Sequence, residues 1–250
     1  MIRRFVLGSL VTIGLTASAV ASDIENLDQA ERDAFRAEVR AYLLENPEVL
    51  MEAIGILEQR QQDNQVNADR NLVAAHSSDL FEDPTSWVGG NPDGDVTIVE
   101  FIDYRCSFCR RAHPEIAQLL DSDDNIRMII KEYPILGEES VLASRFAIAT
   151  RMVEGDDAYK LVGDSLIGVR GRMSHSTFQR IADEFDLDAE AIFAAMGSSE
   201  VETIIQRNHR LARNLQITGT PSFVFGSDMV RGYVPLHDMQ RIVQAIRRDS

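Results

Sequence analysis

The two cysteines of this chain are its most constraining feature. They form a Cys-x-x-Cys motif at the point where a strand-like pattern gives way to a helical one. An apolar, strand-like run over residues 96–102 ends just before Cys106, where a helical pattern begins. Two thiols at this spacing on a first helical turn are close enough to form a disulfide. Closing so short a loop contributes only about 2 kcal/mol, so we expect a bond that is made and broken. The helix N-terminus favours a thiolate, which predicts Cys106 as the nucleophile and Cys109 as the resolving thiol.

The first 21 residues have the pattern of a secretory signal peptide. Arg3 and Arg4 precede an apolar run from Phe5 to about Leu15, and small residues lead to Ala21. We predict cleavage after Ala21 and export to a compartment where disulfides persist, the periplasm of a bacterium. A membrane anchor is the alternative, but the apolar run is short for a span of about 20 residues and contains glycine, serine and threonine.

The acidic charge argues against nucleic acid as a partner. The formal net charge is −15, from 25 basic and 40 acidic residues. Cleavage would remove Arg3 and Arg4 and leave 23 basic residues against the same 40 acidic ones, a net charge of −17. Nucleic-acid binding requires basic surfaces, and solubility is the simpler explanation of this charge.

Residues 22–78 are predicted to be almost entirely helical. One apolar stripe recurs at helical spacing from Phe35 to Leu43, and a second covers residues 49–57. We expect a new helix to begin at Asn46 as its N-cap, with Pro47 at its first position. Such a narrow amphipathic segment cannot bury its stripe on itself. It therefore packs either on copies of itself, which we favour, or on the following domain.

The rest of the chain predicts a small α/β domain. Residues 96–102 and 126–133 are expected strands joined by the helix that begins at Cys106, a parallel βαβ unit. A later hairpin is expected from two short strands, residues 222–225 and 228–231. The remaining expectations are turns at residues 83–84 and 89–94, helices over residues 138–198, a helix capped at Ser199 with Glu202 as the capping-box partner, and a closing helix over residues 236–246.

Three motifs in this order resemble the DsbA-like family of the thioredoxin fold. They are Phe101-Ile-Asp-Tyr-x-Cys-x-Phe-Cys109, Lys131-Glu-Tyr-Pro-Ile-Leu-Gly137 and Gly219-Thr-Pro-Ser-Phe223. The N-terminal segment Tyr42-Leu-Leu-Glu-Asn-Pro-Glu-Val-Leu50 is similar to that of ScsC-type proteins, periplasmic relatives associated with copper tolerance, some of which are trimeric disulfide isomerases. The resemblance implies a thioredoxin fold with a helical insertion. We therefore expect a signal peptide (1–21), a helical region (22–78), and a DsbA-like domain (79–250) with an insertion at about 138–198.

The resemblance also implies roles for three residues. Pro221 matches the cis-proline of the family, which lies against the active-site disulfide, and the backbone of Thr220 would pair with an extended substrate. Glu100 matches a buried acidic residue beneath the cysteines. A desolvated carboxylate there could relay a proton to or from Cys109, whereas the alternative is a surface glutamate at the edge of a strand.

The two residues between the cysteines differ from those of the family's strongest oxidants. Those oxidants place a histidine there, which helps to hold the thiolate, whereas this chain has Ser107 and Phe108. A less stabilised thiolate moves the reduction potential from about −120 mV toward the isomerase-like value of about −180 mV.

Metal binding is the rival use of the thiols. Cys106 and Cys109 could hold Cu(I), with His113 as a weak third candidate on the same helical face. The alternative for His113 is a partly buried polar residue. A structural zinc site is disfavoured because the chain has no second cysteine pair. No cofactor is expected beyond the redox-active disulfide itself.

These patterns together predict an exported thiol–disulfide oxidoreductase, most readily a protein disulfide isomerase or reductase. Its partners would be exported proteins with thiols or disulfides, a membrane redox partner that resets the cysteine pair, and further copies of itself in a homo-oligomer such as a trimer. The alternatives are a monomeric DsbA-like oxidase, a copper-binding protein that uses the same thiols, and a structural surface antigen.

Overall fold

The computed structural model describes residues 27–249, so the predicted signal peptide lies outside the described residues. The chain divides into two compact units, Met1–Arg60 and Gln61–Ser250. The first contains α1 (Gln29–Glu45) and the start of α2 (Glu48–Ala75), and α2 continues into the second. The predicted helical region 22–78 therefore crosses this division. Within the described residues, no helix is both long and apolar enough to span a membrane.

The break between α1 and α2 falls where the sequence predicts it, but its capping differs. Asp28 begins α1 with a capping box shared with Glu31. Asn46 is the C-cap of α1, and its side-chain amide donates to the carbonyl oxygen of Tyr42 at 2.9 Å. The N-cap role expected of Asn46 would use its side-chain oxygen, whereas this bond is a donation from its side-chain amide at the end of α1. The next helix begins at Glu48, one residue after the predicted first position, Pro47.

Most large apolar side chains of residues 27–60 are exposed. None of the α1 residues is buried. The exposed large apolar residues of this part are Phe35, Val39, Tyr42, Leu44, Leu50, Met51, Ile54, Ile56 and Leu57. So many exposed apolar residues on one short segment are characteristic of a surface that another protein covers.

The second unit is built on a five-stranded sheet of order β1-β3-β2-β4-β5. The parallel pair is β2 (Val96–Ile102) and β3 (Ile126–Glu132), as the βαβ pattern predicts. The hairpin strands β4 (Ser222–Phe225) and β5 (Asp228–Arg231) also lie at their predicted positions, with β4 antiparallel to β2. The sequence reading missed β1 (Trp87–Gly90), whose last two residues were expected to begin a turn but which pairs antiparallel with β3.

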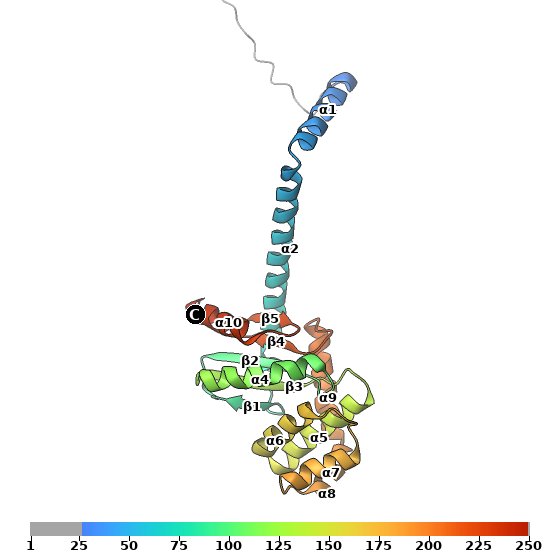
Figure 1. Ribbon diagram of the computed structural model, residues 1–250, viewed down its shortest axis with the longest axis vertical. Coiled ribbons are helices and arrows are strands. Elements are labelled where there is room, and N and C mark those ends of the chain that lie inside the picture. Colours follow the sequence, from blue (N-terminus) through green and yellow to red (C-terminus); the bar gives the residue numbers. More distant parts are fainter. Residues whose placement is uncertain (1–26, 250) are drawn as a thin grey trace, which may run out of the picture. The chain divides into compact units, whose positions relative to one another are not determined.

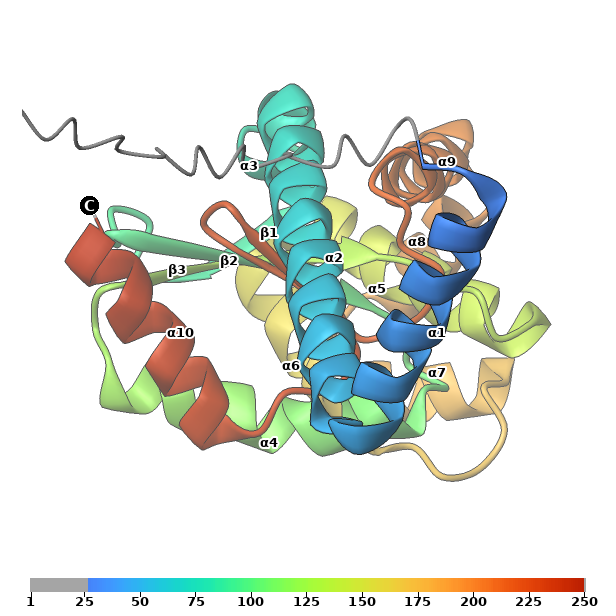
Figure 2. The ribbon, with the colours of Figure 1, turned by 90° about the horizontal axis from the view of Figure 1, so that it is seen from above.

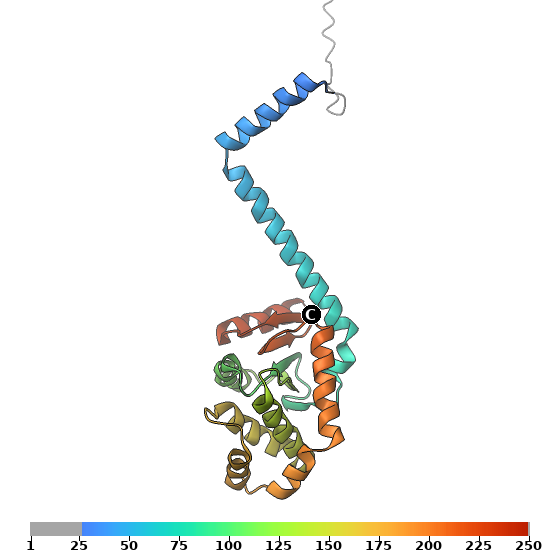
Figure 3. The ribbon, with the colours of Figure 1, turned by 90° about the vertical axis from the view of Figure 1, so that its right-hand side faces the viewer.

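Helices cover both faces of the sheet (Figures 1 and 2). On one face lie α4 (Ser107–Ser122) and α10 (Leu236–Asp249), which pack on the inward side chains of β2 and β3. The other face is covered by α9 (Ser199–Asn214), the short α3 (Ser77–Phe81) and the end of α2. Figure 3 shows α9 running on the opposite side of the sheet from α4. The cysteine pair thus begins a helix supported by a fully covered central strand.

The segment between β3 and α9 contains helices and no strand, as the sequence predicts. It contains α5 (Glu138–Glu154), α6 (Asp156–Gly168), α7 (His175–Glu184) and α8 (Ala189–Met196), which lie together beyond one end of the sheet (Figure 1). The following helix is capped one residue earlier than expected, because the side chain of Ser198, not Ser199, accepts from the backbone of Val201. The insertion therefore lies at the end of the sheet where the cysteines emerge.

Candidate active site

Cys106 occupies the N-cap position of α4, directly after the loop that leaves β2. Its Sγ accepts from the backbone N–H of Cys109 at 3.4 Å, and its own N–H donates to the carbonyl of Asp103. Both cysteines are free and buried, with Cys106 6% exposed and Cys109 fully enclosed. The attacking sulfur therefore lies at the positive end of a helix, and the second sulfur lies behind it.

The pKa of the Cys106 thiol is lower than the ordinary cysteine value, and the pKa of the Cys109 thiol is higher. The hydrogen bond from the Cys109 thiol is the main cause that lowers the pKa of Cys106 to about 5, and the N–H groups of Phe108 and Cys109 add to it. Burial raises the pKa of Cys109, and its bond to Cys106 and the nearby Glu100 raise it further. At neutral pH the pair is therefore one thiolate and one thiol.

Asp103 fixes the loop that carries Cys106, a function that sequence reasoning missed. Its fully buried carboxylate accepts from the backbone N–H of Arg105 at 2.7 Å. It also accepts from the N–H groups of Ile135 and Leu136 at 2.8 and 3.0 Å, in the loop after β3. The bond to the residue two positions on is a local Asx turn, which an aspartate at a strand end could have signalled. The partners after β3 had no local signal.

Thr220 and Pro221 lie beside the cysteine pair although they are more than 100 positions away in the sequence. The Thr220–Pro221 peptide bond is cis, as expected. When it is protonated, the Sγ of Cys106 donates to the carbonyl oxygen of Thr220 at 3.1 Å. The backbone of Thr220 therefore lies at the attacking sulfur, where a substrate chain would also have to lie.

Glu100 lies on the central strand β2 and is only 2% exposed, so the alternative of a surface glutamate at a strand edge is wrong. It stands opposite Ile130 of β3 and Phe223 of β4. Burial is the first cause that raises the pKa of Glu100 to about 8, followed by the charges of Cys106 and Glu132. Its Oε1 has no hydrogen-bond partner among the described residues. It is therefore a buried acid with spare hydrogen-bonding capacity.

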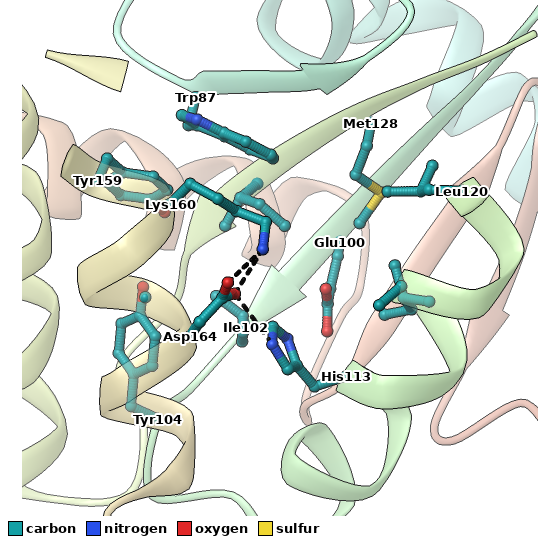
Figure 4. Close-up of a pocket in the computed structure, with 14 residues that line it drawn as sticks. Trp87, Glu100, Ile102, Tyr104, His113, Leu120, Met128, Tyr159, Lys160 and Asp164 are labelled. Atoms are coloured by element: carbon teal, nitrogen blue, oxygen red, sulfur yellow. Dashed lines mark hydrogen bonds and ion pairs between the residues drawn. The ribbon is translucent and has the colours of Figure 1, made fainter. Parts of the chain in front are cut away.

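A pocket of about 60 Å³ adjoins Glu100 (Figure 4). Its lining includes His113 of α4 together with Lys160 and Asp164 of α6, all three partly exposed. The Nε2 of His113 lies 3.0 Å from the Oδ1 of Asp164, which also binds Lys160. Most of the lining is apolar, and Glu100 shares the pocket with these three ionisable side chains. The pocket has the volume to hold water beside those polar groups.

Glu132 forms a second buried acidic site that sequence reasoning missed. Its carboxylate accepts from Tyr104 at 2.8 Å, from Tyr159 of α6 at 2.6 Å and from Ser144 of α5 at 2.7 Å. Burial raises its pKa to about 7, against the lowering effect of these three bonds. Because Tyr104 precedes the cysteines by two residues, this carboxylate joins the catalytic loop to the helical insertion.

His113, the third candidate copper ligand, does not join the two cysteines. His113 lies at the pocket and pairs with Asp164, not with the sulfurs. Across residues 27–249, no three His, Cys, Asp or Glu side chains form a group that could hold a metal ion. Cu(I) binding by Cys106 and Cys109 alone stays a prediction.

Two family models match the chain. The one described as Thioredoxin matches residues 82–245, which include both cysteines, the buried glutamates and the cis-proline. The one described as Copper resistance protein ScsC N-terminal domain matches residues 31–63, where the exposed apolar residues of α1 and α2 lie.

Solved structures resemble most of the chain. A thioredoxin-like oxidoreductase from Silicibacter pomeroyi is 40% identical, with 69% of this chain and 98% of that one covered and a TM-score of 0.65. BcfH from Salmonella enterica Typhimurium is 26% identical, with 86% and 95% covered and a TM-score of 0.70. ScsC from Proteus mirabilis is also 26% identical, with 87% and 98% covered and a TM-score of 0.64.

The chain spans about a fifth of the length of the curated relatives that it matches. These are two Na(+)/H(+) antiporters. The one from Salinispora arenicola is 26% identical over 136 residues, which are 54% of this chain and 21% of the antiporter.

Proposed function

We propose that this chain, which belongs to the thioredoxin family, exchanges disulfides with other exported proteins through Cys106 and Cys109. The observation that carries the proposal is the position of Cys106. Its sulfur caps a helix, has a pKa lowered to about 5, and lies 3.1 Å from the backbone of Thr220. A thiolate at neutral pH beside the partly exposed Thr220 is suited to attack a disulfide in an extended polypeptide.

The first step forms a mixed disulfide. The Cys106 thiolate attacks one sulfur of a substrate disulfide, a Cys106–substrate bond forms, and the substrate's other sulfur leaves as a thiolate. Cys109 then loses its proton and attacks Cys106, which releases the first substrate sulfur as a thiolate. The substrate has gained two electrons and the Cys106–Cys109 pair has lost two. In reverse, the oxidised pair donates its disulfide.

Glu100 is the base that we assign to the second step. The negative charge of Cys106 contributes to its raised pKa, so forming the mixed disulfide removes one cause of that shift. Glu100 then releases its proton more readily, through water in the pocket toward His113 and Asp164. The resulting carboxylate takes the proton of Cys109, whose own pKa is raised by burial.

The isomerase or reductase form of this activity is supported by the N-terminal helices. Their exposed apolar residues would be covered in a homo-oligomer, a trimer being the expected form, so that several cysteine pairs act on one misfolded substrate. The proposal includes export to the periplasm after cleavage at Ala21, and a membrane partner that keeps the pair reduced. A monomeric oxidase is the competing form, and copper binding by the thiols would be a side activity.

Three assays of the mature protein test this proposal. Insulin reduction measures exchange itself, and we expect Cys106→Ser to abolish it. We expect Cys109→Ser to accumulate mixed disulfides that alkylation and gel electrophoresis detect. Reactivation of scrambled ribonuclease separates an isomerase from an oxidase. A protein that neither reduces insulin nor oxidises a dithiol peptide with both sulfurs intact would refute the proposal.

A further inference from the structure

Two arginine-rich stretches stand out in this acidic chain. The chain has 40 acidic residues, yet residues 104–114 and 165–182 contain none. The first stretch includes the cysteine pair, and the second includes the connection between α6 and α7. Together they carry six arginines, namely Arg105, Arg110, Arg111, Arg170, Arg172 and Arg180.

Hydrogen bonds hold the two stretches together at the cysteines. Arg105, next to Cys106, donates from its guanidinium to the carbonyl of Gly171 at 2.7 Å. Arg110, next to Cys109, donates to the carbonyls of Ile167 and Val169 at 2.8 and 3.2 Å. The α6–α7 connection therefore lies beside the start of α4, which carries the two cysteines.

Nearby carboxylates neutralise only part of this charge. Arg105 and Arg172 share one carboxylate, Glu139, at 3.5 and 3.6 Å, and the Arg172 side chain is 90% exposed. Arg170 is also exposed. Glu138 is the other exposed acid on the first turn of α5, while the carboxylate of Glu115 accepts from Tyr233 and the N–H of Leu236.

We propose that the rim formed by Arg105, Arg170 and Arg172 selects substrate segments that carry Asp or Glu beside the reacting cysteine. This inference rests on the proposed exchange activity and names its substrate class. Arg105 precedes Cys106 directly, and Arg172 shares Glu139 with it, so a substrate whose cysteine reaches the Cys106 sulfur would bring its flanking residues near the rim. Exposed charges of this kind act mainly on encounter and are weakened by salt.

Matched peptide disulfides test this preference. Three peptides of equal length carry Glu, Gln or Lys on both sides of one cysteine, and the reduced full-length protein is mixed with each at low and high ionic strength. We expect the Glu peptide to react about fivefold faster than the Gln peptide at low salt, with the Lys peptide slowest, and the differences to shrink in salt. Rates are measured by quenching with acid and mass spectrometry.

Charge variants distinguish an effect of the rim arginines on the peptide rates from an effect of the net charge of the whole protein. We expect the double variant Arg170→Ser/Arg172→Ser to lose most of the ratio between the Glu and Gln rates. Arg241→Ser on α10, where the arginine pairs with Asp238, removes a charge elsewhere and should keep that ratio. Equal rates for the three peptides, or equal effects of both variants, would overturn the inference while leaving the exchange activity intact. No reaction with any peptide would instead count against the exchange activity.

Discussion

The hydroxyl of Tyr104 donates to the buried carboxylate of Glu132 across 2.8 Å. Tyr104 lies in the loop that leads to Cys106, whereas the other donors to Glu132, Tyr159 and Ser144, belong to the helical insertion. One carboxylate therefore connects the sheet, the catalytic loop and two inserted helices. Glu100, the other buried glutamate of the sheet, has an oxygen without any partner in the described structure.

The first prediction concerns the stability of the Glu132 network. Glu132→Gln replaces a carboxylate that accepts three hydrogen bonds from hydroxyl groups. One of its two oxygens becomes an amide NH₂ group, which donates and cannot accept from those hydroxyls. We expect the free energy of unfolding to fall by about 2 kcal/mol or more, because buried donors lose their acceptor. Urea unfolding measures this. Tyr159→Phe removes one donor and keeps the carboxyl group of Glu132 as the acceptor of the other two, so its smaller effect is the control. An unchanged midpoint for Glu132→Gln would contradict the prediction.

The second prediction concerns the pH dependence that Glu100 imposes on stability. Its pKa is about 8 in the folded protein and 4.5 as the ordinary value. Between these two pH values the folded state holds a proton that the unfolded state has released, so the free energy of unfolding falls as the pH rises. The contribution of Glu100 to stability is therefore fully present below pH 4.5 and is lost by about pH 8. We expect Glu100→Gln to gain stability relative to wild type across this window.

The measurement for Glu100 is a difference between two proteins. Cys106 acts in the opposite direction, because its lowered pKa adds stability as the pH rises above about 5. Because the two groups are coupled, urea unfolding compares the reduced Cys106→Ser protein with Cys106→Ser/Glu100→Gln at pH 5, 6.5 and 8, where burial still raises the pKa of Glu100. We also expect Glu100→Gln to slow resolution of the mixed disulfide by at least about tenfold, since a general base is lost. A difference in stability that does not change with pH would refute the assignment.

The third prediction concerns the source of the reactive Cys106 thiolate. The hydrogen bond from Cys109 is the largest cause of its lowered pKa. We expect the rate of alkylation by iodoacetamide to titrate with a midpoint near pH 5 in wild type. Cys109→Ala should raise that midpoint, whereas Cys109→Ser keeps a hydroxyl donor and should raise it less. Equal midpoints in all three proteins would mean that the N–H groups at the helix N-terminus alone set the pKa.

Most of the sheet could be predicted because its strands have local signals. The strand over residues 96–102 is an apolar run that ends shortly before the cysteine pair. The hairpin after Pro221 consists of two short strand-like stretches on either side of Gly226. The edge strand β1 had no such signal. Its two glycines are typical of a turn, and only pairing with β3, some 40 positions later, makes the segment a strand.

The residues of the candidate site that could be predicted from the sequence are those whose contacts are close together in the chain. Cys106 and Cys109 were identified from spacing alone, whereas the expected roles of Thr220, Pro221 and Glu100 rested on family resemblance. Glu132 and its donors were missed because they meet only after the insertion folds back onto the sheet. A charged residue at the end of an apolar strand was the single available hint, since buried charges need partners.

The fourth prediction concerns assembly through the N-terminal helices. Ile54 is 48% exposed on α2 and belongs to the apolar set of the first unit. We expect the mature protein to sediment as an oligomer at micromolar concentration, and Ile54→Glu to sediment as a monomer because it would bury a charge in the interface. Gln62→Glu adds the same charge at an exposed polar position of α2 and is the control. A monomeric wild type would remove the basis for the isomerase form.

The last prediction concerns the reduction potential of the cysteine pair. A stabilised thiolate favours the reduced form, so a lower pKa of Cys106 makes the pair more oxidising. Its pKa of about 5 lies between the values of about 3.5 and 7 known for a strong oxidant and for thioredoxin. We therefore expect a potential near about −180 mV when the protein is equilibrated with glutathione buffers.

A histidine introduced between the cysteines tests the cause of this potential. Phe108 is 56% exposed, so a histidine there can adopt its preferred rotamers without disturbing the core. We expect Phe108→His to lower the pKa of Cys106 and to move the potential toward about −120 mV, because the imidazole donates to the thiolate. Ser107→Ala, at the neighbouring exposed position, should leave the potential within error of wild type. If the wild-type pair is already as oxidising as about −120 mV, then the helix N-terminus and Cys109 hold the thiolate without help from a histidine, and the protein is better suited to donate disulfides than to rearrange them.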